Sequence, residues 1–178
     1  MKTKCSSRMK ALLLVLAMVL SLFCVSIGTA HPRFTDVPDS FWASKEIAWA
    51  VDKGVVNGTS ATTFSPNDKT LRGQMTAILY RYAGEPAVSG ASSFSDVKAS
   101  IYYANAASWA QKNNILISTV SGSNKFLGDT PISRAEFCAM VYNYAGYKSI
   151  DRKTASAAPF SDVKGLSSEL RAAINWAY

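Results

Sequence analysis

The chain of 178 residues is poor in the side chains that most often carry catalysis or hold metals. It has one histidine, His31, and three cysteines, of which only Cys138 lies beyond the first thirty residues. Cys138 stands in an apolar run typical of a small buried side chain, and no nucleophile–base arrangement accompanies it. The composition therefore argues against an enzyme, against a metal or cofactor site, and against a disulfide framework.

Positive charge is also scarcer than the sequence pI of 9.4 suggests. Residues 1–30 combine a basic start, an apolar run over 11–25 and small residues before position 31, which is the pattern of a secretory signal peptide. This segment holds four of the 19 basic residues and none of the 12 acidic ones, so its removal lowers the net charge from +7 to +3. We therefore expect a secreted protein that has no nucleic-acid partner and, after signal cleavage, no membrane partner. An uncleaved signal anchor is the alternative, although the apolar run is shorter than the ~20 residues of a membrane span.

The rest of the chain is organised by one phrase that occurs three times. Phe-x-Asp-Val stands at residues 34–37, 94–97 and 160–163. A Trp-Ala pair follows 15 or 16 residues after each phenylalanine, at residues 49–50, 109–110 and 176–177. A fixed internal period indicates stacked copies of one supersecondary unit. We divide the chain into repeat 1 over residues 31–86, repeat 2 over 87–148, and a partial repeat 3 over 149–178.

Each full repeat predicts a helix, a loop and a second helix. In the first copy, apolar residues at helical spacing indicate a helix within residues 41–53, which Gly54 ends. A second helix is expected from about Leu71 to Ala83. The second copy repeats this pattern with a loop that is two residues longer. The predicted fold class is all-α.

The second helix of each full repeat starts with a motif suited to an acidic ligand. Ser133-Arg134-Ala135-Glu136 is a capping box, which fixes Arg134 in the first helical turn. Free N–H groups and the helix dipole favour anions there, and a guanidinium can hold a carboxylate through two parallel hydrogen bonds. The first copy reads Leu71-Arg72-Gly73-Gln74, so a leucine stands at the position of Ser133, with Thr70 one residue earlier, and Gln74 replaces the glutamate.

The ordered set of Phe-x-Asp-Val, Trp-Ala, Gly-hydrophobic-x-x-Gly, Phe-x-Pro and Ser-Arg-Ala-Glu resembles the S-layer homology family over nearly all of residues 34–178. The resemblance implies a pseudo-threefold, three-prong helical bundle whose third prong is incomplete here. It also implies non-covalent anchoring at the bacterial cell wall or S-layer surface. The expected partner is the secondary cell-wall polysaccharide, a peptidoglycan-associated glycan that often carries pyruvylated sugars.

The resemblance and the residue chemistry together give eight candidates for glycan contact. They are Arg72, Arg134, Asp36, Asp96, Trp42, Tyr102, Gln74 and Glu136. Each has a structural alternative. The arginines could satisfy helix-end geometry or pair with an acidic residue, and the aspartates could be turn or cap residues. The tryptophans at 49, 109 and 176 are expected to be core residues.

A second functional hypothesis follows from the third copy, which reaches Tyr178 without a second helix. An unfinished helix pair would leave an apolar face uncovered, and such faces mark interfaces. The residues expected on this face are Leu166, Leu170, Ala173, Ile174 and Trp176. The alternative to wall anchoring is therefore a structural surface-layer subunit that self-associates, with its incomplete repeat completed by another chain.

Overall fold

The computed structural model describes residues 34–153 and 157–178, so the predicted signal peptide lies outside the described residues. The helices are α2 (Ser44–Asp52), α3 (Arg72–Tyr82), α4 (Ala104–Lys112), α5 (Ser118–Ser121), α6 (Arg134–Tyr147) and α7 (Ser168–Ala177), with a 3-10 turn, η1, at Ser161–Val163. Within the described ranges there is no strand, only an isolated antiparallel bridge between Leu71 and Pro131. The prediction of an all-α fold is confirmed. In the same ranges, no helix has both the length and the apolar character that a bilayer crossing needs.

The first helix of repeat 1 begins later than its apolar pattern predicts. Residues 38–43 form successive turns, in which the amide of Phe41 donates to Pro38 O at 2.8 Å and that of Ser44 donates to Phe41 O at 3.0 Å. Gly54 follows the helix with φ +66°, a left-handed conformation that glycine adopts at little cost. Asn114 takes the same role after α4, with φ +54°.

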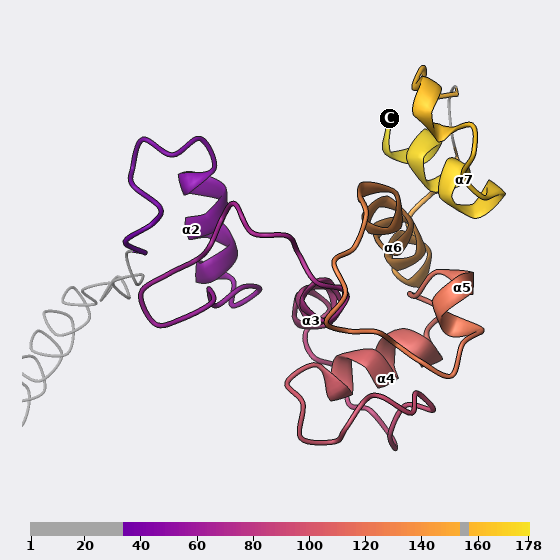
Figure 1. The fold of residues 1–178 in the computed structure, drawn as a ribbon, viewed down its shortest axis with the longest axis horizontal. Coiled ribbons are helices and arrows are strands. Elements are labelled where there is room, and N and C mark those ends of the chain that lie inside the picture. The colour runs from indigo at the N-terminus through magenta and orange to yellow at the C-terminus, as the bar shows by residue number, and fades with distance from the viewer. Residues whose placement is uncertain (1–33, 154–156) are drawn as a thin grey trace, which may run out of the picture. The chain divides into compact units, whose positions relative to one another are not determined.

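The largest helix–helix contacts join different repeats. α3 of repeat 1 packs against α4 of repeat 2, and α6 of repeat 2 packs against α7 of the third copy (Figure 1). α3 also contacts α6. Each of these first helices is thus covered by the second helix of the preceding repeat. No helix in the described part of the chain packs against α2 to a similar extent.

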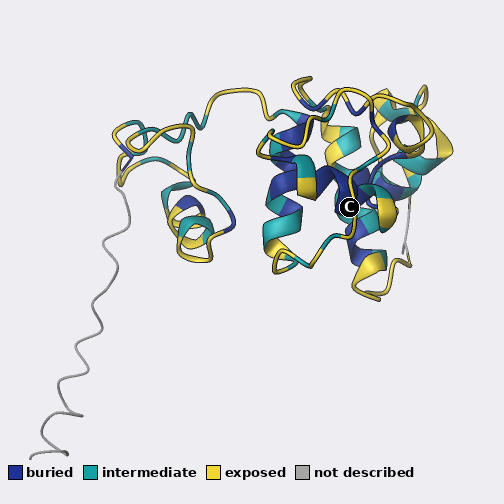
Figure 2. Cartoon of the chain, turned by 90° about the horizontal axis from the view of Figure 1, so that it is seen from below, coloured by how far each residue is buried: buried dark blue, intermediate teal, exposed yellow. Residues whose placement is uncertain are grey.

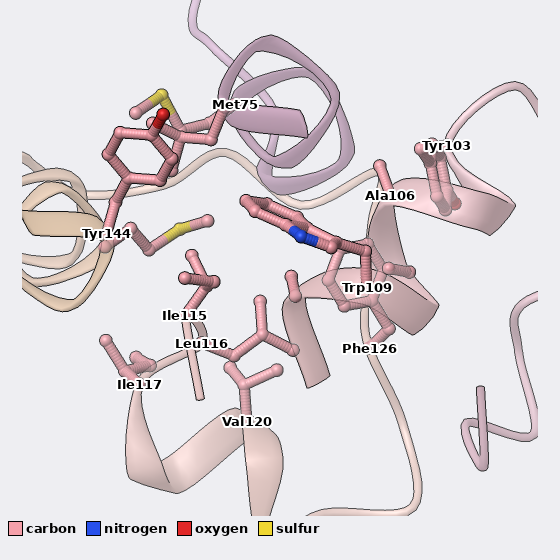
Figure 3. Packing of buried hydrophobic residues seen from close by; sticks show 14 of the residues in the cluster. Met75, Tyr103, Ala106, Trp109, Ile115, Leu116, Ile117, Val120, Phe126 and Tyr144 are labelled. Atoms are coloured by element: carbon pink, nitrogen blue, oxygen red, sulfur yellow. The ribbon is translucent and has the colours of Figure 1, made fainter. Parts of the chain in front are cut away.

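The main core is built around Trp109, which is 2% exposed. Its ring lies 5.5 Å from that of Tyr80 on α3, and 6.3 Å and 5.5 Å from those of Tyr144 and Tyr147 on α6. Aliphatic side chains from α5 and from the segment before it complete the cluster, as Figure 3 shows for Ile115, Leu116 and Val120. One aromatic side chain thus joins α4 to the second helices of both full repeats.

The segment around α2 buries much less surface (Figure 2). Phe34, Ile47 and Val55 are buried, and the Phe34 ring packs on Phe64 at 5.4 Å, but none of them belongs to the main core cluster. Trp49 is 52% exposed although it occupies the repeat position of Trp109. The expectation that Trp49 is a core residue is wrong, because no described helix covers this face of α2.

The third copy also differs from the sequence-based expectation. Ala173 on α7 is fully buried, Leu170 packs against the main core, and Trp176 meets Tyr142 of α6 edge-on at 5.6 Å. The prediction that this helix presents an uncovered apolar face is wrong, because α6 already covers it. Leu166 and Ile174 are half-buried. The open first helix lies at the other end of the repeat series, at α2.

The contrast between the two tryptophans predicts unequal losses of stability. Trp109→Ala should lower the free energy of unfolding by about 3–5 kcal/mol, because it leaves a large cavity in the core. Trp49→Ala should change it by less than about 1 kcal/mol, because half of that side chain is already in water. Denaturant unfolding of both variants checks this pair, and equal losses would contradict the packing described.

Candidate functional site

Arg72, at the start of α3, lies between the two full repeats. Its side chain donates to Phe126 O at 3.0 Å and Leu127 O at 3.1 Å in the loop of repeat 2, and to the Glu136 carboxylate at 3.0 Å. The residue is 7% exposed. A guanidinium held by two carbonyls and a carboxylate is a structural clamp, and its donors are turned toward the protein. We call this contact the Arg72 latch.

Backbone hydrogen bonds surround the latch. The amide of Arg72 donates to Thr130 O at 2.9 Å, and that of Gly73 donates to Gly128 O at 2.8 Å. In the opposite direction, the amide of Ile132 donates to Thr70 O at 3.0 Å. The first-turn N–H groups expected to attract an anion at α3 are therefore occupied by the loop of repeat 2.

Two glycines allow this close approach. A Cβ atom on Gly73 or on Gly128 would come within 2.4 Å of the Tyr103 side chain, which is 3% exposed. The Tyr103 ring therefore lies against the backbone of both repeats. Gly73 departs from the Ser-Arg-Ala-Glu pattern because an alanine at this position would collide with the ring.

Glu136 accepts hydrogen bonds both at the start of its own helix and in the Arg72 latch. Its Oε2 accepts from the amide of Ser133 at 2.8 Å, while Ser133 Oγ accepts from the amide of Glu136 at 3.1 Å, so the predicted capping box is confirmed. Partial burial acts to raise the pKa of Glu136, but the Ser133 amide and the Arg72 guanidinium outweigh it and hold the pKa below 4.5.

In repeat 1 only half of the capping box exists. Gln74 Oε1 accepts from the amide of Leu71 at 2.8 Å, and a leucine side chain cannot return the bond.

Asp36 and Asp96 play the same part in the two repeats. Asp36 accepts from the amides of Phe64 at 2.9 Å and Ser65 at 2.6 Å, and Asp96 accepts from those of Phe126 and Leu127, both at 2.8 Å. The Phe64 amide, opposed by slight desolvation, lowers the pKa of Asp36. For Asp96, desolvation acts to raise the pKa, but the two amides prevail and the pKa falls. Each aspartate thus fixes the loop of its own repeat.

Trp42 and Tyr102 are exposed aromatic residues at the same position before the first helix of each repeat. Trp42 is 86% exposed and Tyr102 is 60% exposed. Phe41 supports the Trp42 ring at 5.9 Å, and Tyr103 supports the Tyr102 ring edge-on at 5.0 Å. Both residues present open aromatic faces.

Arg134, at the start of α6, has a different environment from Arg72. Its side chain is exposed and makes no hydrogen bond or ion pair with any residue that the structure describes. It lines an open depression of about 470 Å³ together with Lys69, Thr70, Ile132, Ser133, Phe137 and Cys138. Phe137 is 45% exposed. The depression therefore combines two cationic side chains with an apolar floor.

Of the eight candidates, the structure brings only Arg72 and Glu136 into contact. Arg134, Trp42 and Tyr102 are left with open surfaces, while the others accept or donate within the protein. Lys69 and Phe137 were not predicted from the sequence. The repeat pattern does not single out Lys69, because Pro131 stands at the equivalent position in the second copy. Phe137 is one of several apolar residues of α6, so its sequence context does not mark it as a surface residue.

The two arginines should respond differently to removal of the side chain. Arg72→Ala should lower the free energy of unfolding by about 3 kcal/mol, because it leaves two carbonyls and the Glu136 carboxylate without their donor. Arg134→Ala, the matched control at the same repeat position, should change it by less than about 0.5 kcal/mol. Chemical denaturation measures both, and a neutral Arg72→Ala variant would show that the latch contributes nothing to stability.

The depressed pKa values predict a loss of stability in acid. Folding lowers the pKa of Asp36, Asp96 and Glu136, so the unfolded chain binds more protons than the folded chain as the pH falls. Their contribution is therefore complete above the ordinary values of 3.8 and 4.5 and is lost as the pH drops through the folded-state values. Unfolding midpoints measured across this range should fall toward low pH, with a smaller fall in Asp96→Asn than in the unchanged chain. A midpoint that rises in acid would contradict the assignment.

Comparison with known proteins agrees with the repeat structure. The model of the S-layer homology domain matches residues 33–76 and 93–138, just over half of the chain. An endoglucanase of a Bacillus species is 31% identical over 153 residues, which is 79% of this chain and 15% of the endoglucanase. An amylopullulanase of Thermoanaerobacterium thermosulfurigenes is 30% identical over 135 residues, or 75% of this chain and 7% of that protein.

An S-layer protein of Bacillus anthracis is 28% identical over 116 residues, or 65% of this chain and 13% of that protein. The chain thus spans at most 15% of each of these three relatives. Both family matches reach into the second helix of a repeat and include the arginine at its start. With two matched repeats, joined by the Arg72 latch, the chain belongs to the S-layer homology family.

Proposed function

We propose that this chain holds an exported protein at the bacterial cell wall by binding the secondary wall polysaccharide non-covalently. Family membership supports this function, because the matched region occurs in relatives named as an S-layer protein and as two different glycan-degrading enzymes. A module shared by such different proteins fits a common location better than a common reaction. The expected location is outside the cell, on the wall.

The observation that carries the proposal is the open guanidinium of Arg134. Its donors face a depression that also holds Lys69, so a ligand with a carboxylate can be held by one forked contact and one further positive charge. Phe137 offers an apolar surface beside them for the non-polar face of a sugar ring. A pyruvylated sugar has both features, a carboxylate and a ring, and is the ligand we propose.

The other predicted contacts fall into two groups. Trp42 and Tyr102 have exposed rings on which further sugars of a polymer could stack. Arg72, Asp36, Asp96, Gln74 and Glu136 act within the protein, and we propose that they support binding by fixing the loops and helix starts.

A catalytic role is a poorer fit to the same geometry. Glycoside hydrolysis needs two carboxyl groups free to exchange protons and contact the sugar. The carboxylates of Asp36, Asp96 and Glu136 each accept backbone amides, and their pKa values are lowered, which disfavours a general acid. We therefore propose a binding module without catalysis of its own.

Sedimentation with purified wall sacculi tests the proposal. The full chain should co-sediment with sacculi that retain their polysaccharide, and Arg134→Ala should weaken binding by roughly tenfold or more, because a charge-assisted contact is lost. Lys45→Ala, which removes an exposed positive charge on α2, is the matched control and should bind as the unchanged chain does.

Sacculi stripped of polysaccharide by acid provide the second control. Retention should be lost on them. Undiminished binding to stripped sacculi, or equal binding by the Arg134→Ala and Lys45→Ala variants, would overturn the proposed function.

A further inference from the structure

Three tyrosine side chains gather at the C-terminal ends of α3 and α6. Tyr82 is the last residue of α3, Tyr147 is the last residue of α6, and Tyr144 lies three residues earlier on α6. The Tyr144 ring points from α6 toward α3 (Figure 3), and it lies 5.9 Å from the ring of Tyr82 and 6.0 Å from that of Tyr147. We call these three residues the tyrosine cluster. Because α6 begins at Arg134 and ends at Tyr147, about 20 Å of helix separates these two residues.

An extra turn of α6 completes the cluster. Tyr82 and Tyr144 occupy the same repeat position, each two residues before a glycine. α3 ends at Tyr82, and Gly84 follows with φ +87°. Gly146, by contrast, lies inside α6, and the helix continues to Tyr147. The difference between the two helices therefore places a third aromatic ring beside Tyr144.

The hydroxyl groups of the cluster have no hydrogen-bond partner among the residues that the structure describes. Two other tyrosines packed in or against the core do have partners. Tyr80 Oη donates to Pro86 O at 2.9 Å, and Tyr103 Oη donates to Asp129 at 3.4 Å. Tyr144 is only 7% exposed, yet its hydroxyl still reaches solvent. A nearly buried phenol thus presents a free hydroxyl between two exposed rings.

The cluster also lacks charge. Burial raises the pKa of Tyr144, and the nearby phenols of the other two tyrosines raise it further, with no contribution from a described acidic or basic side chain. The Tyr144 hydroxyl therefore keeps its proton at neutral pH and can both donate and accept. Of the charged residues beside the cluster in sequence, Arg81 is paired with Glu85 at 4.0 Å, and Lys148 is exposed.

We propose that the tyrosine cluster is a second carbohydrate site, which binds a neutral sugar residue. Tyr82 is 57% exposed and Tyr147 is 38% exposed, so their rings offer faces of negative charge density to the C–H groups of a sugar ring. The phenol hydroxyls can exchange hydrogen bonds with sugar hydroxyls. An apolar protein surface fits less well, because it would cover the Tyr144 hydroxyl without giving it a partner.

The two sites differ in the sugar that they select. The depression at Arg134 holds two cationic side chains and suits an acidic sugar, whereas the tyrosine cluster suits an uncharged one. A polymer with both kinds of unit can contact both sites, and two linked contacts bind more tightly than one. The inference itself does not rest on the Arg134 site, because a neutral sugar can be tested alone.

Titration of the full chain with two neutral trisaccharides, triacetylchitotriose and cellotriose, tests the proposal. NMR signals of the tyrosine rings should shift saturably with at least one of them, with a dissociation constant on the order of 1 mM. The largest shifts should occur at Tyr82, Tyr144 and Tyr147.

Four variants make the result specific. Tyr144→Phe keeps the ring but should weaken binding about fivefold, because one hydrogen bond is lost. Tyr147→Ala, at an exposed position, should weaken it by about tenfold, because a stacking face is lost. Tyr178→Phe, which removes a hydroxyl from a residue that is 65% exposed, is the matched control and should bind as the unchanged chain does. Arg134→Ala should also bind the trisaccharides normally, which separates this test from that of the wall-anchoring function.

No saturable shift with either trisaccharide, or equal affinities of the Tyr144→Phe and Tyr178→Phe variants, would overturn the proposal. Shifts centred on Trp42 and Tyr102 would overturn it by placing the neutral sugar on other aromatic faces. Shifts at the cluster that grow with protein concentration in the absence of sugar, together with a dimer in light scattering, would show that a second copy of the chain is the occupant.

Discussion

A buried guanidinium destabilises a protein unless its donors find acceptors, and this requirement shapes the junction between the two full repeats. Arg72 meets it with the carbonyls of Phe126 and Leu127 and the carboxylate of Glu136. Those carbonyls point inward because Asp96 holds the amides of the same two residues. The carboxylate is in place because the capping box with Ser133 fixes it. The start of α3, the loop of repeat 2 and the start of α6 therefore depend on one side chain.

The local structure could be read from the sequence, because it depends on contacts between near neighbours. The repeat period predicted the order of the longer helices, Gly54 marked the end of α2, and Ser133 with Glu136 predicted the capping box. Gly146, by contrast, lies inside α6. The pairing of helices could not be read in the same way. An apolar stripe on a helix shows that the helix is covered on one side but not which helix covers it. Trp49 and Trp109 have equivalent sequence contexts, yet one is exposed and the other buried, because only α4 follows a second helix.

The candidate site, too, could be predicted only in part from the sequence. Arg72 and Arg134 occupy one motif position, so the sequence treats them alike. The structure separates them because a following loop and a capping glutamate are available to Arg72, whereas Arg134 faces an open depression. Lys69 and Phe137 both line this depression because the segment before α3 lies against the start of α6. These two segments are far apart in the sequence. A repeat protein can thus use one motif for cohesion in one copy and for an exposed surface in the next.

The most direct test of this account is to map, by NMR chemical-shift changes, where a purified pyruvylated wall polysaccharide binds the full chain. The account predicts that the largest changes occur at Lys69, Arg134 and Phe137, with the side-chain signals of Arg72 nearly unchanged because that guanidinium is already engaged. Changes centred on Arg72 and its carbonyl partners, or no saturable changes at all, would contradict it.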